Sequence, residues 1–183
     1  MLSIVKSMTL HGLEGFIVDV QVDVAGGLPC WEIVGLPDVS IRESKERVRT
    51  AIKNSGYEFP SRRIVINLAP ATIKKVGSAF DLPIAVAILL ATDNINEFDF
   101  ENVAFVGELS LDGNVHSING ILPMCIEAKK LGIKEIIVPK ENAKEASIVD
   151  GISVIPVSSL NQVVAYLNKS IKINPEKFNS NEL

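Results

Sequence analysis

The segment from Pro70 to Pro83 carries the residues of this chain best suited to nucleophilic chemistry. Lys74 and Lys75 precede a Gly-Ser pair, and Asp81 opens the apolar run that follows. A desolvated lysine could take the proton of the Ser78 hydroxyl, and glycine at a turn could let backbone N–H groups face an anion. In the structural alternative, Ser78 and Asp81 cap a helix and the lysines stay in solvent. We favour this alternative, because Ser and Asp are common helix caps.

Other catalytic and metal-binding patterns are missing from the sequence. The two histidines, His11 and His116, do not form a zinc motif, and neither cysteine has a second Cys or a His at zinc spacing. No glycine is followed by lysine, so the chain lacks the Gly-Lys-Ser/Thr loop that cradles nucleotide phosphates. The sequence therefore predicts no metal site and no ATP hydrolysis by these residues alone.

Cysteine usage and hydropathy indicate a cytoplasmic domain with no membrane contact. Cys30 and Cys125 stand far apart in apolar surroundings, which favours two buried free thiols in a reducing compartment. The first residues of the chain lack the apolar core that a signal peptide requires. The longest apolar run, residues 82–91, has ten residues, about half of the roughly 20 that cross a bilayer.

Basic residues are concentrated in one stretch of an acidic chain. The net charge is −4, yet residues 41–75 contain nine basic and three acidic side chains, a balance of +6 that leaves −10 elsewhere. Cations on one face could neutralise phosphates without reading base sequence. The alternative is a solvated helix face with internal ion pairs, and it is favoured because no aromatic residue interleaves with the cations. The candidate nucleic-acid contacts are Arg42, Lys45, Arg49, Lys53, Arg62, Arg63, Lys74 and Lys75.

Hydrophobic periodicity predicts antiparallel strands first and helices later. Period-2 alternation predicts a strand over residues 16–24, with four valines on one face, after a first strand over residues 2–10. The Gly-Gly pair that follows and a strand over residues 31–34 suggest a hairpin spanning residues 16–34. A helix then runs to Gly56, capped by Asp38 or Ser40, and the pairs Arg42/Glu46 and Glu43/Arg47 could brace its outer face.

The second half of the chain alternates strands with helices. A buried helix is expected over residues 81–91, and periodicity is lost after Asn168. We therefore expect one α/β (α+β) domain over residues 1–168, followed by a linker over residues 169–183. The expected strands are residues 63–68, 103–106, 108–111, 135–138 and 152–156, and the expected later helices are residues 119–131, 141–148 and 158–168.

Five ordered motifs resemble the N-terminal domain of the YifB/ComM family of magnesium-chelatase-like AAA+ ATPases. That domain is similar to the proteolytic domain of Lon protease, so the resemblance implies a ribosomal-protein-type βαβ fold with a mixed sheet and helices packed on it. The motifs are Val34-Gly-Leu-Pro-Asp38, the stretch Val48 to Pro60, Ile66-Asn-Leu-Ala-Pro-Ala71, Phe80-Asp-Leu-Pro-Ile-Ala85 and Phe105-Val-Gly-Glu-Leu-Ser110.

The resemblance to Lon implies a protease fold without protease chemistry. Lon uses a Ser-Lys dyad, and the motif register places Ala79 at the serine position and Leu122 at the lysine position. An alanine has no nucleophile and a leucine has no amine to accept a proton. The alternative is a peptidase with a shifted register, in which Ser78 acts with Lys74 or Lys75 as base.

The resemblance also implies a role in DNA processing. The ComM type is a ring-forming, ATP-driven DNA motor that promotes branch migration during natural transformation. ATP and Mg would act in a separate AAA+ module, so no cofactor is expected in this chain. The implied partners are that module, neighbouring subunits of a ring, and DNA. We expect the domain to contact DNA or to organise the ring, and a purely structural scaffold is a third possibility.

Overall fold

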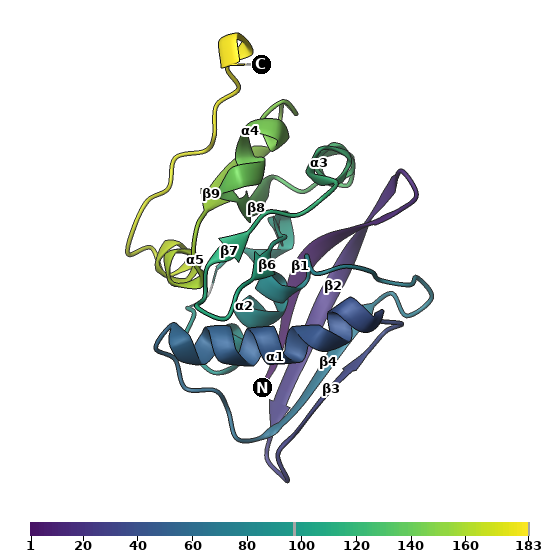
Figure 1. The fold of residues 1–183 in the computed structure, drawn as a ribbon, viewed down its shortest axis with the longest axis vertical. Helices are drawn as coiled ribbons and strands as arrows, with labels where there is room; N and C mark the ends of the chain where they lie inside the picture. Colours follow the sequence, from purple (N-terminus) through teal and green to yellow (C-terminus); the bar gives the residue numbers. More distant parts are fainter. Residues whose placement is uncertain (97, 183) are drawn as a thin grey trace.

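Two long antiparallel strands form the centre of the sheet in the computed structural model, which describes residues 1–96 and 98–182 (Figure 1). β1 (Leu2–His11) and β2 (Glu14–Ala25) are joined by a two-residue turn. Gly12 in this turn has a φ of +66°, a left-handed conformation that glycine adopts without strain. The alternating valines of β2 are all buried on one face, as the period-2 pattern predicts.

Seven strands make one mixed sheet in the order β3-β4-β2-β1-β5-β8-β9. The neighbours β3–β4, β1–β5, β5–β8 and β8–β9 are parallel, and the other two pairs are antiparallel. A separate short hairpin pairs β6 with β7. The remaining strands are β3 (Cys30–Val34), β4 (Arg63–Ala69), β5 (Val103–Phe105), β6 (Glu108–Leu109), β7 (Val115–His116), β8 (Glu135–Pro139) and β9 (Ser153–Val157).

The predicted hairpin over residues 16–34 is wrong. β3 does not pair with β2, because β4 lies between them and bonds to both. The helix that connects β3 to β4 makes these two strands parallel, which is the usual result of a helical crossover. β4 suits the inner position because its alternate residues Ile64, Ile66 and Leu68 are all buried.

Helices cover both faces of the sheet. α1 (Val39–Asn54), α2 (Asp81–Ala91) and α5 (Leu160–Leu167) share one apolar core, while α3 (Ile121–Lys130) and α4 (Ala143–Ala146) share a second one. Successive residues of β8 alternate between these cores, since Ile136 and Val138 belong to the second and Ile137 to the first. Figure 1 shows α1 crossing over the β4 end of the sheet. Short 3-10 turns occur at Phe100–Asn102, Lys140–Asn142 and Ser180–Glu182.

The α/β (α+β) class with a mixed sheet and packed helices is confirmed. One expected helix is shorter than its pattern suggests, because residues 141–148 divide between a 3-10 turn and α4. Within the expected linker, Ile173 packs against the first core and the N–H of Glu176 donates to the carbonyl of Val154. Leu183, the last residue of that linker, lies outside the described residues.

Candidate nucleic-acid interface

Four cations lie along one stripe of α1. Their spacing of three, four and four residues brings them to the same side of successive helical turns. The helix begins where predicted, because the Asp38 carboxylate accepts a hydrogen bond of 2.9 Å from the N–H of Ile41. The apolar residues of α1 face the core and leave this stripe beside it. The stripe consists of Arg42, Lys45, Arg49 and Lys53.

The far end of the stripe borders a cleft of about 390 Å³ between α1, β3 and residues 59–62. Trp31 and Phe59 lie in its wall with ring centroids 5.3 Å apart at an interplanar angle of 77°. The guanidinium carbon of Arg49 lies 5.2 Å from the centroid of the Phe59 ring, a cation–π contact. Lys53 and Arg62 complete the cationic lining. The cleft therefore combines three cations with two aromatic rings.

This arrangement corrects one step of the sequence argument. The prediction that no aromatic residue interleaves with the cations is wrong, because Tyr57 and Phe59 lie between Lys53 and Arg62 in the sequence. The β3–α1–β4 crossover adds Trp31, whose ring contacts Phe59, and Phe59 in turn contacts Arg49. Aromatic rings and cations are therefore neighbours in the folded structure as well as along the chain.

The other candidate contacts divide between the surface and the interior. Arg62 and Arg63 are exposed at the start of β4, and Lys74 is exposed in the loop before α2. Lys75 is fully buried, and its ammonium donates to the carbonyl of Gly35 at 2.9 Å and to the carbonyl of Pro70. Burial lowers the pKa of Lys75. The expectation that both lysines lie in solvent is therefore wrong for Lys75, which the structure does not bring together with the surface cations.

Among the residues that the structure describes, the surface cations of this set form no ion pair with a carboxylate. Of the two helix pairs considered from sequence, Glu43–Arg47 is present at 3.8 Å, and Arg42–Glu46 is not among the ion pairs of the described residues. Within residues 1–96 and 98–182, seven candidate contacts have no ion-pair partner. They are Arg42, Lys45, Arg49, Lys53, Arg62, Arg63 and Lys74.

Arg47, the remaining basic residue of α1, is engaged in the interior. Its Nε donates to the Asp81 carboxylate at 2.7 Å, and the Ser44 hydroxyl donates to the same group at 2.6 Å. The N–H of Leu109 adds a third donor at 3.1 Å. Asp81 is fully buried, and desolvation raises its pKa although these donors oppose the shift. Asp81 therefore joins α1, α2 and β6.

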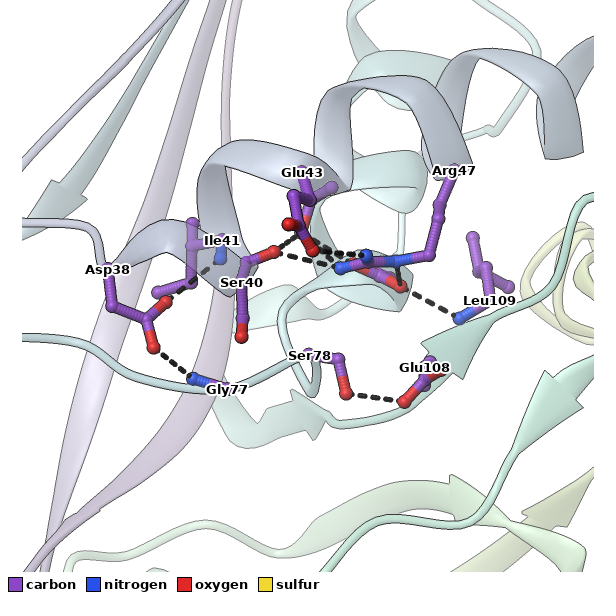
Figure 2. Close-up of polar contacts among 11 residues, drawn as sticks. Asp38, Ser40, Ile41, Glu43, Arg47, Gly77, Ser78, Glu108 and Leu109 are labelled. Carbon is purple, nitrogen blue, oxygen red and sulfur yellow. Dashed lines mark hydrogen bonds and ion pairs between the residues drawn. The ribbon is translucent and has the colours of Figure 1, made fainter.

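The predicted caps of α2 are wrong. The N-cap position is held by Phe80 without a side-chain hydrogen bond, since Asp81 turns inward to Arg47. Ser78 instead donates its hydroxyl proton to the Glu108 carboxylate at 2.5 Å. Figure 2 shows this contact below α1, beside the bond from the Gly77 N–H to Asp38. Sequence reasoning missed these partners because they lie on other elements.

Ala79 and Leu122, which the resemblance to Lon places at the two dyad positions, are both apolar residues. Ala79 is almost fully buried and borders a hollow of about 290 Å³, together with Ser78 and Glu108. Leu122 is half-buried at the start of α3. Ser78 and Lys75 each make their hydrogen bonds to other groups, and Lys74 is exposed.

Three further sequence expectations can be compared with the structure. Cys125 is buried as expected, but Cys30 is exposed because it opens the edge strand β3. The described residues contain no group of three or more His, Cys, Asp or Glu side chains that could hold a metal ion. In the same part of the chain, no helix has the length and apolarity required to span a bilayer.

Comparison with known proteins supports the family resemblance. Residues 20–142 match the family model of subunit ChlI of Mg-chelatase. The chain is 37% identical over 172 residues to the competence protein ComM of Haemophilus influenzae, covering 94% of this chain and 34% of that protein. It is 39% identical over 166 residues to the uncharacterized protein YifB of Escherichia coli, covering 91% of this chain and 33% of YifB.

A more distant similarity links the chain to Lon. Lon protease 2 of Bacillus subtilis is 29% identical over an alignment of 191 positions, and this alignment covers 94% of the present chain and 33% of that enzyme. The chain therefore spans about a third of the length of these relatives. The predicted resemblance to ComM, YifB and Lon is confirmed.

Proposed function

The chain belongs to the family of subunit ChlI of Mg-chelatase, and from this membership we propose that it is a non-catalytic module through which a ComM/YifB-type protein contacts DNA. One observation carries this proposal. Seven surface cations on α1, on the start of β4 and in the loop before α2 have no ion-pair partner among the described residues. Such cations can exchange their counterions for DNA phosphates, and the released counterions drive binding.

A wider proposal concerns the full-length protein to which this domain would belong. We propose that such a protein is an ATP-driven motor for DNA branch migration, as the resemblance to the ComM type implies, and that it acts in natural transformation. The name competence protein borne by one relative is consistent with that role. ATP and Mg would act in an AAA+ module outside these 183 residues, and the present domain would contact that module and neighbouring subunits in the cytoplasm.

Fluorescence anisotropy with a labelled DNA of about 30 nucleotides tests the DNA contact directly. We expect weak binding by the 183-residue chain at 50 mM salt. If about four phosphates are neutralised, affinity falls about 100-fold between 50 and 200 mM salt. The double variant Arg42→Gln/Lys45→Gln should lower the magnitude of the salt slope by about 2, because each phosphate contact contributes about one unit.

A matched control removes the same charge from another part of the molecule. Lys134 and Lys140 flank β8, are exposed and have no ion-pair partner among the described residues. Lys134→Gln/Lys140→Gln should leave the salt slope unchanged. No binding at 50 mM salt, or an equal effect of the two double variants, would overturn the proposal. If DNA binding fails while the domain still associates with the rest of the protein, ring organisation becomes the better proposal.

A peptidase based on Ser78 with Lys74 or Lys75 is the alternative, and no contact among the described residues favours it. Ser78 is hydrogen-bonded to a carboxylate, which can accept its proton but is a much weaker base than a free amine. Lys75 donates to two backbone carbonyls. Hydrolysis of a casein substrate that is lost in Ser78→Ala would support the peptidase over the DNA-contacting module.

A further inference from the structure

We propose that the cleft beside α1 binds one unpaired nucleotide, so that this surface prefers single-stranded to duplex DNA. The inference rests on the proposed DNA contact and specifies which form of DNA the surface takes. The cleft is the place where the cationic stripe of α1 meets the aromatic side chains of Trp31 and Phe59. A nucleotide carries the two chemical groups that match this lining, a phosphate and a flat aromatic base.

The charge of the cleft selects an anion. Arg49, Lys53 and Arg62 line it, and none of the described residues in its wall is a carboxylate. The neighbouring hollow of about 470 Å³ shares Arg62 but includes Glu58 and Asp93. A phosphate is therefore favoured on the α1 side of Arg62 and disfavoured on the other side. The DNA backbone should leave the cleft along the stripe of α1, toward Lys45 and Arg42.

Two side-chain donors of residues that line the cleft lack a hydrogen-bond partner among the described residues. The indole Nε1 of Trp31 and the Nε of Arg49 are shielded from solvent and have no hydrogen-bond partner among the described residues. Unsatisfied buried donors cost free energy, so a small adjustment that gave them an acceptor would be favourable. Phosphate and base oxygens are acceptors of this kind. The donors therefore favour the same ligand as the charges.

The size and shape of the cleft favour an unpaired base. Its volume of about 390 Å³ lies in the range of small-molecule sites, about 300 to 1,000 Å³, and is far too small for a duplex. A base within a duplex is stacked and paired, and it must leave the helix at a cost before a pocket can hold it. A base in a single strand pays little of this cost and can stack on an aromatic ring. Duplex DNA would reach only the exposed cations outside the cleft.

Trp31 is the single tryptophan of the chain, so its fluorescence reports on this cleft alone. We expect an oligo(dT) strand of about 20 nucleotides to quench it in a saturable manner, and a duplex of the same length to leave it nearly unchanged. In anisotropy titrations, the single strand should bind about tenfold more tightly than the duplex, as one stacked base would provide.

Substitution separates the cleft from the rest of the cationic surface. Trp31→Leu keeps an apolar side chain but removes the stacking face, so it should weaken single-strand binding about tenfold and leave duplex binding unchanged. The control Phe178→Leu changes an exposed aromatic residue of the C-terminal segment and should change neither affinity. Circular dichroism verifies that both variants fold. If Trp31→Leu does not fold, the quenching of Trp31 in the native protein by single strand and by duplex tests the inference in its place.

Alkylation of Cys30 provides a second, independent measurement of binding at the cleft. It is exposed and lines the cleft, whereas Cys125 is buried. Saturating oligo(dT) should slow alkylation of Cys30 by iodoacetamide at least several-fold, and duplex should not. Equal binding of both DNA forms, with Trp31 unquenched and Cys30 unprotected, would overturn this inference and leave the DNA contact standing. Absence of binding to either form would overturn both.

Discussion

Asp81 determines which arginine of α1 is withheld from the surface. Its carboxylate holds Arg47 through two hydrogen bonds, of 2.7 and 3.1 Å. Arg49, two residues later on the helix, has a ring contact but no carboxylate partner among the described residues. Arginines of identical chemistry thus perform different tasks because the helix turns them toward different neighbours. The sequence alone shows only that both are basic.

Lys75 provides a prediction at the same scale. Because burial lowers its pKa, the folded protein binds fewer protons than the unfolded chain between that lowered pKa and the ordinary value near 10.5. Its contribution to the free energy of unfolding therefore rises with pH in this interval. We expect the stability of the native protein, relative to Lys75→Met, to increase between pH 8 and pH 10.5 in urea titrations.

The neighbouring lysine is the control for this measurement. Lys74→Met removes the exposed lysine next to Lys75 and is measured over the same pH range. Because each variant is expressed as a difference from the native protein, the contributions of the tyrosines, which titrate in both proteins, are removed from the measured pH dependence. A difference for Lys75→Met that is flat or falls with pH would contradict the assignment of Lys75 as a desolvated cation.

At the scale of elements, Asp38 joins the start of α1 to the loop before α2. One carboxylate oxygen accepts from the N–H of Ile41 and the other from the N–H of Gly77, at 2.9 and 3.0 Å. Asp38→Ala should lower the free energy of unfolding by about 1 to 2 kcal/mol, as the loss of an N-cap does. Chemical denaturation of the native protein and of Asp38→Ala measures this difference in the free energy of unfolding.

Ser40 tests the specificity of that cap. Sequence reasoning left Asp38 and Ser40 as alternative caps, and the structure assigns the role to Asp38. Ser40→Ala should therefore change the stability by less than about 0.5 kcal/mol, in the range of ordinary surface substitutions. Similar losses in the two variants would show that the cap is shared.

Elements with strong periodicity could be predicted from the sequence, and their partners could not. The apolar run of α2 and the alternating valines of β2 give these elements within a residue or two. The neighbour of β3 depends on β4, which lies about 30 residues further along, so no local pattern reveals it. The site follows the same rule. The stripe of α1 follows from residue spacing, whereas the cleft requires Trp31 and Phe59 to meet across the crossover.

At the scale of the whole molecule, the net charge of −4 conceals an uneven distribution. Residues 41–75 carry +6 and the rest of the chain −10, and the surface cations among them are left unpaired by the fold. A molecule of this kind is repelled by DNA in most orientations and attracted in a few. Electrostatics should therefore act on the rate of association more than on the lifetime of the complex.

The stripe and the cleft should consequently differ in kinetics. Arg42→Glu/Lys45→Glu, at the end of the stripe away from the cleft, should slow the association with oligo(dT) about tenfold and change dissociation little, because exposed charges mainly steer the encounter. Trp31→Leu should do the reverse, because it removes a contact made only after docking. Stopped-flow anisotropy resolves the two rates, with Lys134→Glu/Lys140→Glu as the charge-matched control. If both sets of substitutions altered the same rate constant, the stripe and the cleft would form one contact and not a steering surface beside a binding site.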